Sequence, residues 1–318
     1  MAEETTAATS RAAGPAWRRW LFLIVPAVAI VELGLHIHQV RSVTPDDDWK
    51  AAKPLVQKRI KPDDLLVFSP RWVDPVGRQF FGNELATYER EGYGDVSRYP
   101  RAIEVSIRGA HNPELEGWKA VESETAGSVT VTTYENPAPV KLVDDLMPHI
   151  GEAGTHVFEE TGNGEHECSF QHLTAVAGSL FGGPAAPADR YVCPSAAIVG
   201  LSIVADMEYR PRRCIYAPLN IGGVSLKIRF DAIHFGKALH GHHLVSVFQE
   251  REGTGAPVTL SFSSGSKVIG RVVHRDRDWW KPFEFDTSDL AGSTGELVTE
   301  VTAPRPDGRL YCFEADTR

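Results

Sequence analysis

The stretch Val224-Ser225-Leu226-Lys227-Ile228-Arg229-Phe230 alternates strictly between apolar and polar side chains. Successive side chains of a β-strand point to opposite faces of a sheet, so this stretch predicts a strand with one buried face. Further strand-like runs follow, separated by turn-forming Gly, Pro and Asp residues. These runs cover 239–249, 258–262, 268–274, 283–286, 297–302 and 310–315. So many short strands predict an antiparallel β-sandwich of jelly-roll type over residues 201–318.

The region from 46 to 150 mixes helix and strand signals. Three consecutive acids, Asp46 to Asp48, favour the start of a helix, and apolar residues recur at helical spacing until Pro62. We expect a small α/β domain here, which makes the overall class α+β. Its predicted elements are strands at 65–68 and 102–107, a hairpin of 121–124 and 128–134 turning at Ala126-Gly127, and a helix at 139–149.

Residues 151–200 have no sustained period. Gly162, Gly164, Gly182, Gly183, Pro184 and Pro187 punctuate the stretch, which also contains two cysteines. It is interpreted as a Gly/Pro-rich connection, either a linker or a cystine-tied elaboration of the sandwich.

Residues 20–40 are predominantly apolar and, as a helix, are long enough to cross a bilayer. Arg18 and Arg19 precede this stretch, so the positive-inside rule predicts a cytoplasmic tail at 1–19 and an extracytoplasmic chain from residue 42 onward. The stretch is interpreted as a transmembrane signal anchor in the inner membrane, with a periplasmic remainder. A cleaved signal peptide, with Ala27-Val28-Ala29 as its cleavage site, is the main alternative. A buried helix of a soluble protein is the third.

The four cysteines, Cys168, Cys193, Cys214 and Cys312, all lie on the predicted exported side. An even number in an oxidising compartment predicts two disulfides, and the absence of a Cys-x-x-Cys pair disfavours a zinc site. Cys214 lies at the first sandwich strand and Cys312 within the last. Because the chain ends of a jelly roll commonly run side by side, we predict the pairs Cys214–Cys312 and Cys168–Cys193.

The charge and the motifs exclude several classes of function. With 33 basic and 42 acidic residues the formal net charge is −9, which disfavours binding to nucleic acid. His166-Glu167 lacks the second histidine of a zinc-protease motif at position 170, and the chain contains neither a Gly-x-Ser-x-Gly elbow nor a phosphate-binding loop. The sequence therefore favours a non-catalytic protein without an organic cofactor.

Three groups of side chains are candidate sites. Trp279 and Trp280 adjoin and are the candidate ligand-binding residues; opposite strand faces would expose one and bury the other, which makes Trp279 the candidate for stacking on a sugar ring and Trp280 for the core. The favoured alternative places both rings in the core or at its rim. Asp206, Glu208 and Asp316 could supply oxygen ligands to a structural Ca²⁺. His240 and His242, with His243 nearby, could bind a transition metal, although a surface histidine cluster is the favoured interpretation.

Two resemblances extend this interpretation. The run Asp48-Trp49-Lys50-Ala51-Ala52, followed by Lys61-Pro62-Asp63-Asp64-Leu65, is similar to the extracytoplasmic region of bacterial membrane glycosyltransferases related to protein mannosyltransferases, over residues 48–70. Residues 210–318 resemble the β-sandwich modules of bacterial carbohydrate-active envelope proteins, at His274-Arg275-Asp276, Trp280-Lys281-Pro282-Phe283 and Tyr311-Cys312-Phe313-Glu314-Ala315.

The resemblances imply a role connected with glycans. Those transferases have many membrane spans and an acidic catalytic residue in an early loop, whereas this chain has one predicted span, so no transferase activity is carried over. We expect a membrane-anchored binding or accessory protein, with a glycan or an envelope glycosylation complex as its partner. A divergent glycan hydrolase or glycosyltransferase is the alternative, and a purely structural interaction protein is the third.

Overall fold

The computed structural model describes residues 23–41, 43–173, 187–219, 224–305 and 308–318. The chain divides into two compact units, Met1–Pro45 and Asp46–Arg318. The predicted cytoplasmic tail at 1–19, with Arg18 and Arg19, and the start of the predicted span at 20–22 lie outside the described residues. So do Gly182, Gly183 and Pro184 of the predicted connection.

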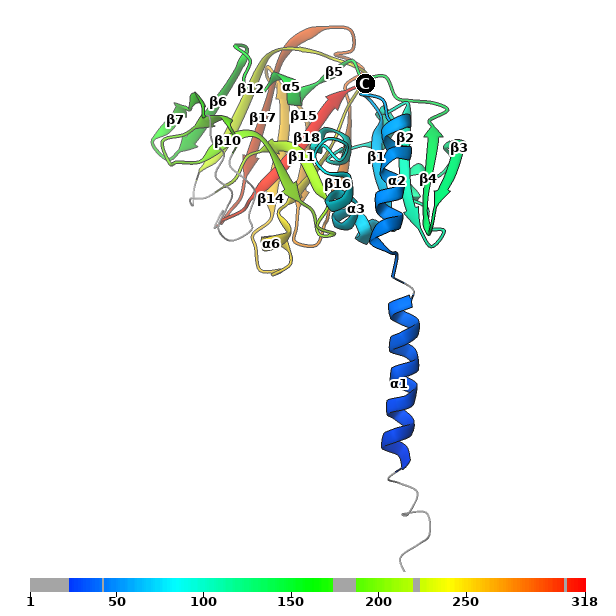
Figure 1. The fold of residues 1–318 in the computed structure, drawn as a ribbon. Helices are drawn as coiled ribbons and strands as arrows, with labels where there is room; N and C mark the ends of the chain where they lie inside the picture. Colours follow the sequence, from blue (N-terminus) through cyan, green and yellow to red (C-terminus); the bar gives the residue numbers. More distant parts are fainter. Residues whose placement is uncertain (1–22, 42, 174–186, 220–223, 306–307) are drawn as a thin grey trace, which may run out of the picture. The chain divides into compact units, whose positions relative to one another are not determined.

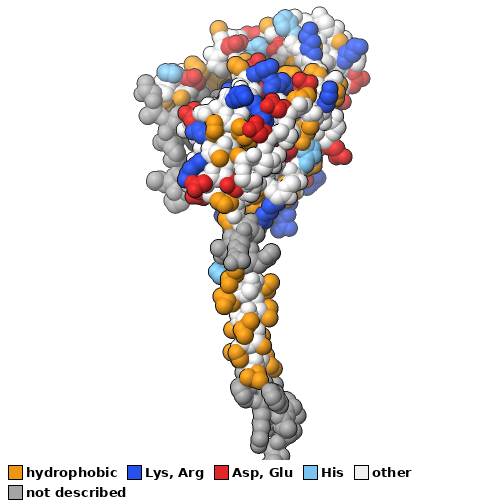
Figure 2. All heavy atoms as spheres, turned by 45° about the vertical axis from the view of Figure 1, so that its right-hand side comes forward, with side chains coloured by type: hydrophobic (Ala, Val, Ile, Leu, Met, Phe, Trp, Pro, Cys, Tyr) orange, Lys and Arg blue, Asp and Glu red, His pale blue; other side chains and the backbone are white. Residues whose placement is uncertain are grey.

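The first unit contains helix α1, Ile24–Arg41, which covers most of the predicted span. Its side chains from Ile24 to Ile37 are exposed, and many of them are apolar (Figure 2). Within the described ranges, no helix combines the length and the apolar character needed to cross a membrane.

The second unit begins with a four-stranded sheet in the order β1-β2-β4-β3. Strand β1 runs parallel to β2, and the other neighbours are antiparallel. Helices α2 and α3 pack on one face, where Trp49, Phe68, Phe81 and Ile103 share a core (Figure 1). The bounds are α2 Asp46–Arg59, β1 Leu65–Ser69, α3 Asp74–Phe81, β2 Arg101–Ile107, β3 Lys119–Ala126 and β4 Val129–Glu135. The predicted helix and strands are confirmed here, and Gly127 takes the positive φ of +60° that the hairpin turn requires.

Four short helices connect these elements and approach the sandwich. They are the 3-10 helices η3 Arg71–Val73, η4 Val96–Arg98 and η5 Pro113–Leu115, and the single-turn helix α4 Tyr88–Glu91. Asn112 begins η5 by accepting a hydrogen bond from the backbone N–H of Glu114 at 2.9 Å. Asp95 begins η4 in the same way, through the N–H of Ser97 at 2.8 Å.

Two antiparallel sheets then enclose one large core, as expected for a β-sandwich. One sheet has the order β16-β13-β18-β11-β10-β9-β8, with β5 also paired to β18, and the other has the order β15-β14-β17-β12-β6-β7. The predicted strand at 224–230 is β12, with buried Leu226, Ile228 and Phe230 alternating with partly exposed polar residues. The bounds are β5 Asp144–Asp145, β6 Thr155–Thr161, β7 Gly164–Glu167, β8 Ser169–His172, β9 Asp189–Val192, β10 Ile198–Ala205, β11 Pro211–Tyr216, β12 Ser225–His234, β13 Ala238–Val245, β14 Val258–Ser264, β15 Lys267–His274, β16 Lys281–Asp286, β17 Thr294–Thr302 and β18 Tyr311–Thr317, with helices α5 Leu146–His149 and α6 Val247–Glu250.

The expected connection at 151–200 is part of the sandwich. Strand β6 lies between β12 and β7, and β8, β9 and β10 extend the other sheet from β11. The predicted boundary at residue 201 is therefore wrong, and of the two interpretations of this stretch the cystine-tied elaboration holds. The strand pattern of β6 was hidden by Glu159, a buried charge whose carboxylate accepts a hydrogen bond from the backbone N–H of Ser195 at 2.9 Å.

The predicted helix at 139–149 is mostly absent. Only its last turn is helical, as α5, because Asp144 and Asp145 pair with the final strand β18. The backbone N–H of Val143 also donates to the carbonyl of Thr317, at 2.8 Å. Contacts with the distant C-terminal strand thus override the local preference of this segment.

Both predicted disulfides are present. Cys214 in β11 joins Cys312 in the neighbouring β18, with 5.8 Å between their Cα atoms. Cys168 joins Cys193 across the β8–β9 end of the same sheet, with 4.2 Å between Cα atoms. The expected reason holds for the first pair, because the strands at the start and end of the predicted sandwich are hydrogen-bonded neighbours.

Candidate binding site between the small sheet and the sandwich

The small sheet docks on the sandwich through buried charged groups. Arg210 and Arg212, at the start of β11, reach back to Tyr93, which follows α4. The Arg210 guanidinium donates to the Tyr93 hydroxyl at 2.6 Å, and Arg212 donates to the Tyr93 carbonyl at 2.8 Å. Both guanidinium groups also lie over the Tyr93 ring, at 5.5 and 5.7 Å from its centroid. These contacts hold the loop 92–96 against β11.

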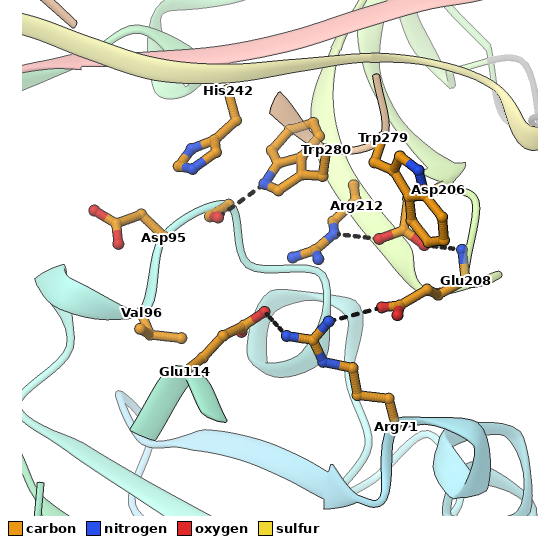
Figure 3. Close-up of a pocket in the computed structure, with 11 residues that line it drawn as sticks. Arg71, Asp95, Val96, Glu114, Asp206, Glu208, Arg212, His242, Trp279 and Trp280 are labelled. Carbon is orange, nitrogen blue, oxygen red and sulfur yellow. Dashed lines mark hydrogen bonds and ion pairs between the residues drawn. The ribbon is translucent and has the colours of Figure 1, made fainter. Parts of the chain in front are cut away.

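A pocket of about 290 Å³ lies at this junction (Figure 3). The small sheet and its loops contribute one set of lining residues, and the sandwich contributes the other. Its wall therefore exists only when the two parts are packed together. The lining residues are Arg71, Gly94, Asp95, Val96 and Glu114 from the first part, and Asp206, Glu208, Arg212, His242, Trp279 and Trp280 from the second.

Arg71 connects the two sides of the pocket. Its guanidinium pairs with Glu114 of the small-sheet part at 3.1 Å and with Glu208 of the sandwich part at 3.0 Å. Figure 3 shows the two carboxylates on either side of this guanidinium. Each group is only partly exposed, so the three side chains form a fixed row of charged hydrogen-bonding groups.

Asp206 fixes the turn that carries Glu208. One of its oxygens accepts hydrogen bonds from the backbone N–H groups of Glu208 at 2.9 Å and Arg210 at 3.0 Å. The other oxygen accepts from the Arg212 guanidinium at 2.9 Å. The side chain is buried and fully engaged, so it shapes the pocket wall rather than offering a free ligand group.

Trp280 forms the inner aromatic wall. Its ring stacks on His242, with 5.3 Å between centroids and 7° between planes, and the Arg212 guanidinium lies 5.4 Å from its centroid. Its indole N–H donates to the Gly94 carbonyl at 2.9 Å. A Cβ at Gly94 would overlap the carboxyl group of Glu314, so the close approach of the residue 94 backbone to Glu314 requires glycine. Trp280 is thus committed to the packing of the junction.

Trp279 is exposed beside it, with 46% of its surface accessible. Its backbone has the left-handed φ of +62°, which is unusual for a residue other than glycine. The backbone N–H of Trp279 donates to the buried carboxylate of Glu250 at 2.8 Å. The two tryptophans therefore divide, with Trp279 accessible and Trp280 packed, so the favoured interpretation that places both in the core or its rim is wrong for Trp279. They precede β16 rather than lying on a strand.

Two of the pocket carboxylates, Glu114 and Asp95, are held in the ionised form. Burial alone raises the pKa of Glu114, but the neighbouring Arg210, Arg212 and Arg71 outweigh this effect and lower that pKa to about 2. Burial also raises the pKa of Asp95, but hydrogen bonds from Ser97 and Arg318 outweigh this effect and lower that pKa to about 2. Both groups therefore act at neutral pH as hydrogen-bond acceptors and have no proton to donate.

A more basic carboxyl lies behind the wall. Glu314 in β18 is buried, which raises its pKa, although its hydrogen bond with His242 at 2.8 Å works in the opposite direction. It does not line the pocket. Its hydrogen-bond partner His242 does line the pocket.

The predicted calcium site is not formed. Asp206 and Glu208 line the pocket, but Asp316 does not, and each of the three carboxylates pairs with an arginine instead. Among the described residues, no group of three or more His, Cys, Asp or Glu side chains is arranged to hold a metal ion. The prediction is wrong because each acid is neutralised by an arginine: Asp206 and Asp316 by arginines six and two residues away, and Glu208 by Arg71, 137 residues away.

The histidine cluster is not a surface feature. Strand β13 lies between β16 and β18 inside its sheet, so His240 and His242 are mostly covered and His243 is fully buried on the opposite face. The rings of His240 and His242 adjoin at 5.1 Å, as their spacing predicts. The favoured interpretation as a surface cluster is wrong, because it assumed an exposed sheet face.

Sequence reasoning missed Arg71, Asp95, Glu114 and Arg212 as pocket residues. One local signal was available, since Asn112-Pro113 marks the start of a short helix and so gives Glu114 a fixed place. The meeting of Arg71 and Glu208, 137 residues apart, has no local signal.

No known protein-family profile matches the chain, and no curated protein sequence matches it. Several solved structures show partial similarity. A Clostridium perfringens ZmpB structure, described as CBM51-2 in complex with GlcNAc and INT domains, is 10% identical over 51% of this chain and 37% of its own, with a TM-score of 0.29. The Endo-D glycoside hydrolase domain of Streptococcus pneumoniae R6 is 20% identical over 36% and 19%, with a TM-score of 0.24. The secreted serine protease VesC of Vibrio cholerae is 10% identical over 68% and 42%, with a TM-score of 0.22.

The chain thus spans less than half the length of each of these three structures. One of the three is described as containing a carbohydrate-binding module, and another as a glycoside hydrolase domain. At these TM-scores the similarities carry no argument about what the pocket binds.

Proposed function

We propose that the pocket binds a saccharide and that the protein is a non-catalytic glycan-binding or accessory protein. The observation that carries this proposal is the exposed indole of Trp279 at a pocket that is also lined by fixed charged groups. A sugar ring presents an apolar face of C–H groups and a rim of hydroxyls. The indole suits the face, while guanidinium donors and carboxylate acceptors suit the rim.

Fixed geometry favours binding of such a polar ligand. Arg71 and Arg212 are each held by a carboxylate within 3.1 Å, so little rotamer freedom remains to be lost when hydroxyls replace water. The cavity is at the small end of the range for ligand pockets, about 300–1,000 Å³. A single sugar ring with its hydroxyls is a ligand of suitable size.

Hydrolysis is less well supported by the pocket's electrostatics. A glycosidase needs one carboxylic acid that carries a proton at working pH, beside a second that is ionised. Asp95 and Glu114 both have a pKa lowered to about 2, so neither can serve as that acid. The alternative of a divergent glycan-processing enzyme would need a proton donor other than these two groups.

The test is a glycan array probed with the full disulfide-bonded chain and with Trp279→Ala. Removing the stacking surface should weaken glycan retention roughly three- to tenfold while the thermal unfolding midpoint stays within a few degrees. Phe170→Ala is the matched control. This substitution removes an exposed aromatic ring from β8, at the sheet edge opposite β16. The variant should retain glycans as the unaltered chain does.

Two results would contradict the proposal. The first is an array on which the unaltered chain retains no glycan. The second is equal retention by the unaltered chain and Trp279→Ala. Release of reducing sugar from a bound glycan would instead favour the enzyme alternative.

We also propose that residues 42–318 are exported and stay attached to the inner membrane through residues 20–40. The two disulfides support an oxidising compartment, and Arg18 and Arg19 support a cytoplasmic N-terminus. An alkaline phosphatase fused after Arg318 should be active and should sediment with membranes. Activity of a reporter that works only in the cytoplasm would overturn export, and a freely soluble fusion would favour the cleaved signal peptide.

A further inference from the structure

Exposed aromatic side chains gather around the pocket. In the described part of residues 46–318, four large aromatic residues are exposed: Trp72, Phe170, Tyr209 and Trp279. Trp279 lines the pocket, Trp72 directly follows the lining residue Arg71, and Tyr209 directly follows the lining residue Glu208. Phe170, which adjoins no lining residue, packs against Tyr191 on the neighbouring strand, at 5.1 Å between ring centroids. The Tyr209 ring meets Phe248 edge to face at 6.4 Å, and its hydroxyl accepts a hydrogen bond from Arg251 at 3.4 Å.

Trp72 and Tyr209 come from opposite sides of the junction. Each adjoins in sequence one member of the Arg71–Glu208 ion pair, which spans 3.0 Å at the pocket, although neither Trp72 nor Tyr209 lines the pocket itself. Their exposed fractions are 61% and 54%. Together with Trp279 they supply aromatic surface from η3, from the β10–β11 turn and from the segment before β16.

The backbone at these positions is held in unusual conformations. Tyr209 has a φ of +60° and Trp279 a φ of +62°, and Arg108, whose guanidinium lies 5.7 Å from the centre of the Trp72 ring, has a φ of +57°. Left-handed conformations of residues other than glycine persist only where the surrounding contacts impose them, and they concentrate at ligand-binding sites. The turn at Tyr209 is imposed by Asp206, whose carbonyl accepts the Tyr209 N–H at 2.8 Å.

The size of the pocket limits what it can enclose. At about 290 Å³ it suits one sugar ring, so the rest of a longer chain must lie outside it. The surface next to it presents indole and phenol rings, which offer apolar faces to sugar rings at low cost in side-chain entropy.

We propose that the pocket is the central subsite of an extended surface on which Trp72, Tyr209 and Trp279 contact separate rings of one unbranched oligosaccharide. This inference rests on the proposed function, and it specifies the ligand as a chain of several sugar units rather than a monosaccharide or disaccharide. Trp279 contacts the unit in the pocket, and Trp72 and Tyr209 contact units beyond it.

Size-graded ladders test the inference. The probes are linear β-1,4-linked glucose, β-1,4-linked N-acetylglucosamine and α-1,4-linked glucose oligomers of two to six units, titrated calorimetrically into the full chain. For the ladder that binds, affinity should rise at least tenfold from the dimer to the hexamer. Trp72→Ala and Tyr209→Asn should each weaken hexamer binding about threefold or more and leave dimer binding unchanged. Asn is chosen at 209 because it tolerates a positive φ.

The controls separate this inference from the proposed function. Trp72→Phe should retain most of the hexamer affinity, and Phe170→Ala should bind every oligomer as the unaltered chain does. Equal affinity for dimer and hexamer, or hexamer binding unaffected by both Trp72→Ala and Tyr209→Asn, would overturn the extended surface. If Trp279→Ala still weakened binding in that case, the pocket itself would stand. Failure of all three ladders to bind would overturn the inference, and failure of the glycan array as well would overturn the proposed function.

Discussion

Glu250 places a buried carboxylate directly behind Trp279. The side chain is fully buried, and one of its oxygens accepts the Trp279 backbone N–H at 2.8 Å, while His274 Nε2 lies 3.4 Å from the same oxygen. The acceptor fixes a residue with a left-handed backbone, so the orientation of the exposed indole depends on a fully buried group behind it.

We predict that Glu250→Ala weakens glycan retention and that Glu250→Gln, which can still accept the same hydrogen bond, largely restores it. In a Trp279→Ala background, Glu250→Ala should cause no further loss of binding, because its effect acts through the indole. The measurement is a double-mutant cycle of dissociation constants, with the disulfide content and the unfolding midpoint of each variant recorded. Additive losses would show that Glu250 acts by another route.

His243 gives the stability of the protein a pH dependence. Its ring is fully buried, its Nδ1 lies 2.9 Å from the Tyr311 hydroxyl, and it meets His274 edge to face at 5.0 Å. Burial, with smaller contributions from His274 and Lys281, lowers the pKa of His243 to about 3. The folded state thus keeps this imidazole neutral at pH values where the unfolded chain, with a pKa of about 6.5, binds a proton.

The unfolded state is therefore favoured as the pH falls from about 6.5 towards 3. Between pH 7.5 and pH 5.0, His243 should account for a loss of about 2 kcal/mol in the free energy of unfolding. Urea denaturation of the unaltered chain and of His243→Gln at both pH values measures this contribution, since the other titrating groups are common to both proteins. An equal loss in the variant would contradict the assignment to His243.

At the scale of elements, the disulfides connect strands that are distant in sequence. The Cys214–Cys312 bond closes a separation of 98 residues between neighbouring strands β11 and β18, and Cys168–Cys193 closes one of 25 residues. In the chain-entropy description, a longer closed loop restricts the unfolded state more strongly.

We predict that Cys214→Ala/Cys312→Ala lowers the free energy of unfolding by up to about 4–5 kcal/mol and Cys168→Ala/Cys193→Ala by up to about 3–4 kcal/mol. Urea denaturation of the two double variants shows which of them loses more free energy of unfolding. Peptide mapping without reductant checks the pairing itself, and finding Cys312 joined to Cys168 or Cys193, or four free thiols, would contradict it.

At the scale of the whole molecule, residues 46–318 fold as one compact unit. A fragment of residues 201–318 would lack β6, which pairs with β12, and β8 to β10, which continue from β11. It would also lose the core residues Leu146, Val157, Tyr191 and Val199.

We predict that the fragment 201–318 is unfolded or aggregated and that 46–318 is folded and monodisperse. Circular dichroism, proteolysis and gel filtration distinguish these states. A cooperative unfolding transition of the short fragment would show that the later strands form a sufficient core without the earlier ones.

The sequence by itself determined the features that neighbouring residues encode. Period-two alternation identified β12, an apolar spacing near 3.6 identified α2, and Gly127 located the hairpin turn, because each pattern reports which side of a local element is buried. It also predicted both disulfide pairs.

Only the tertiary structure decided where the sandwich begins, which histidines are buried, and where the pocket lies. The strand β6 contains the buried charge Glu159, whose hydrogen-bond partner Ser195 comes from another segment. The pocket likewise depends on Arg71 meeting Glu208, and on Trp280 meeting Gly94. A buried or paired charge is stable only beside its partner, and no local pattern records a partner that lies a hundred residues away.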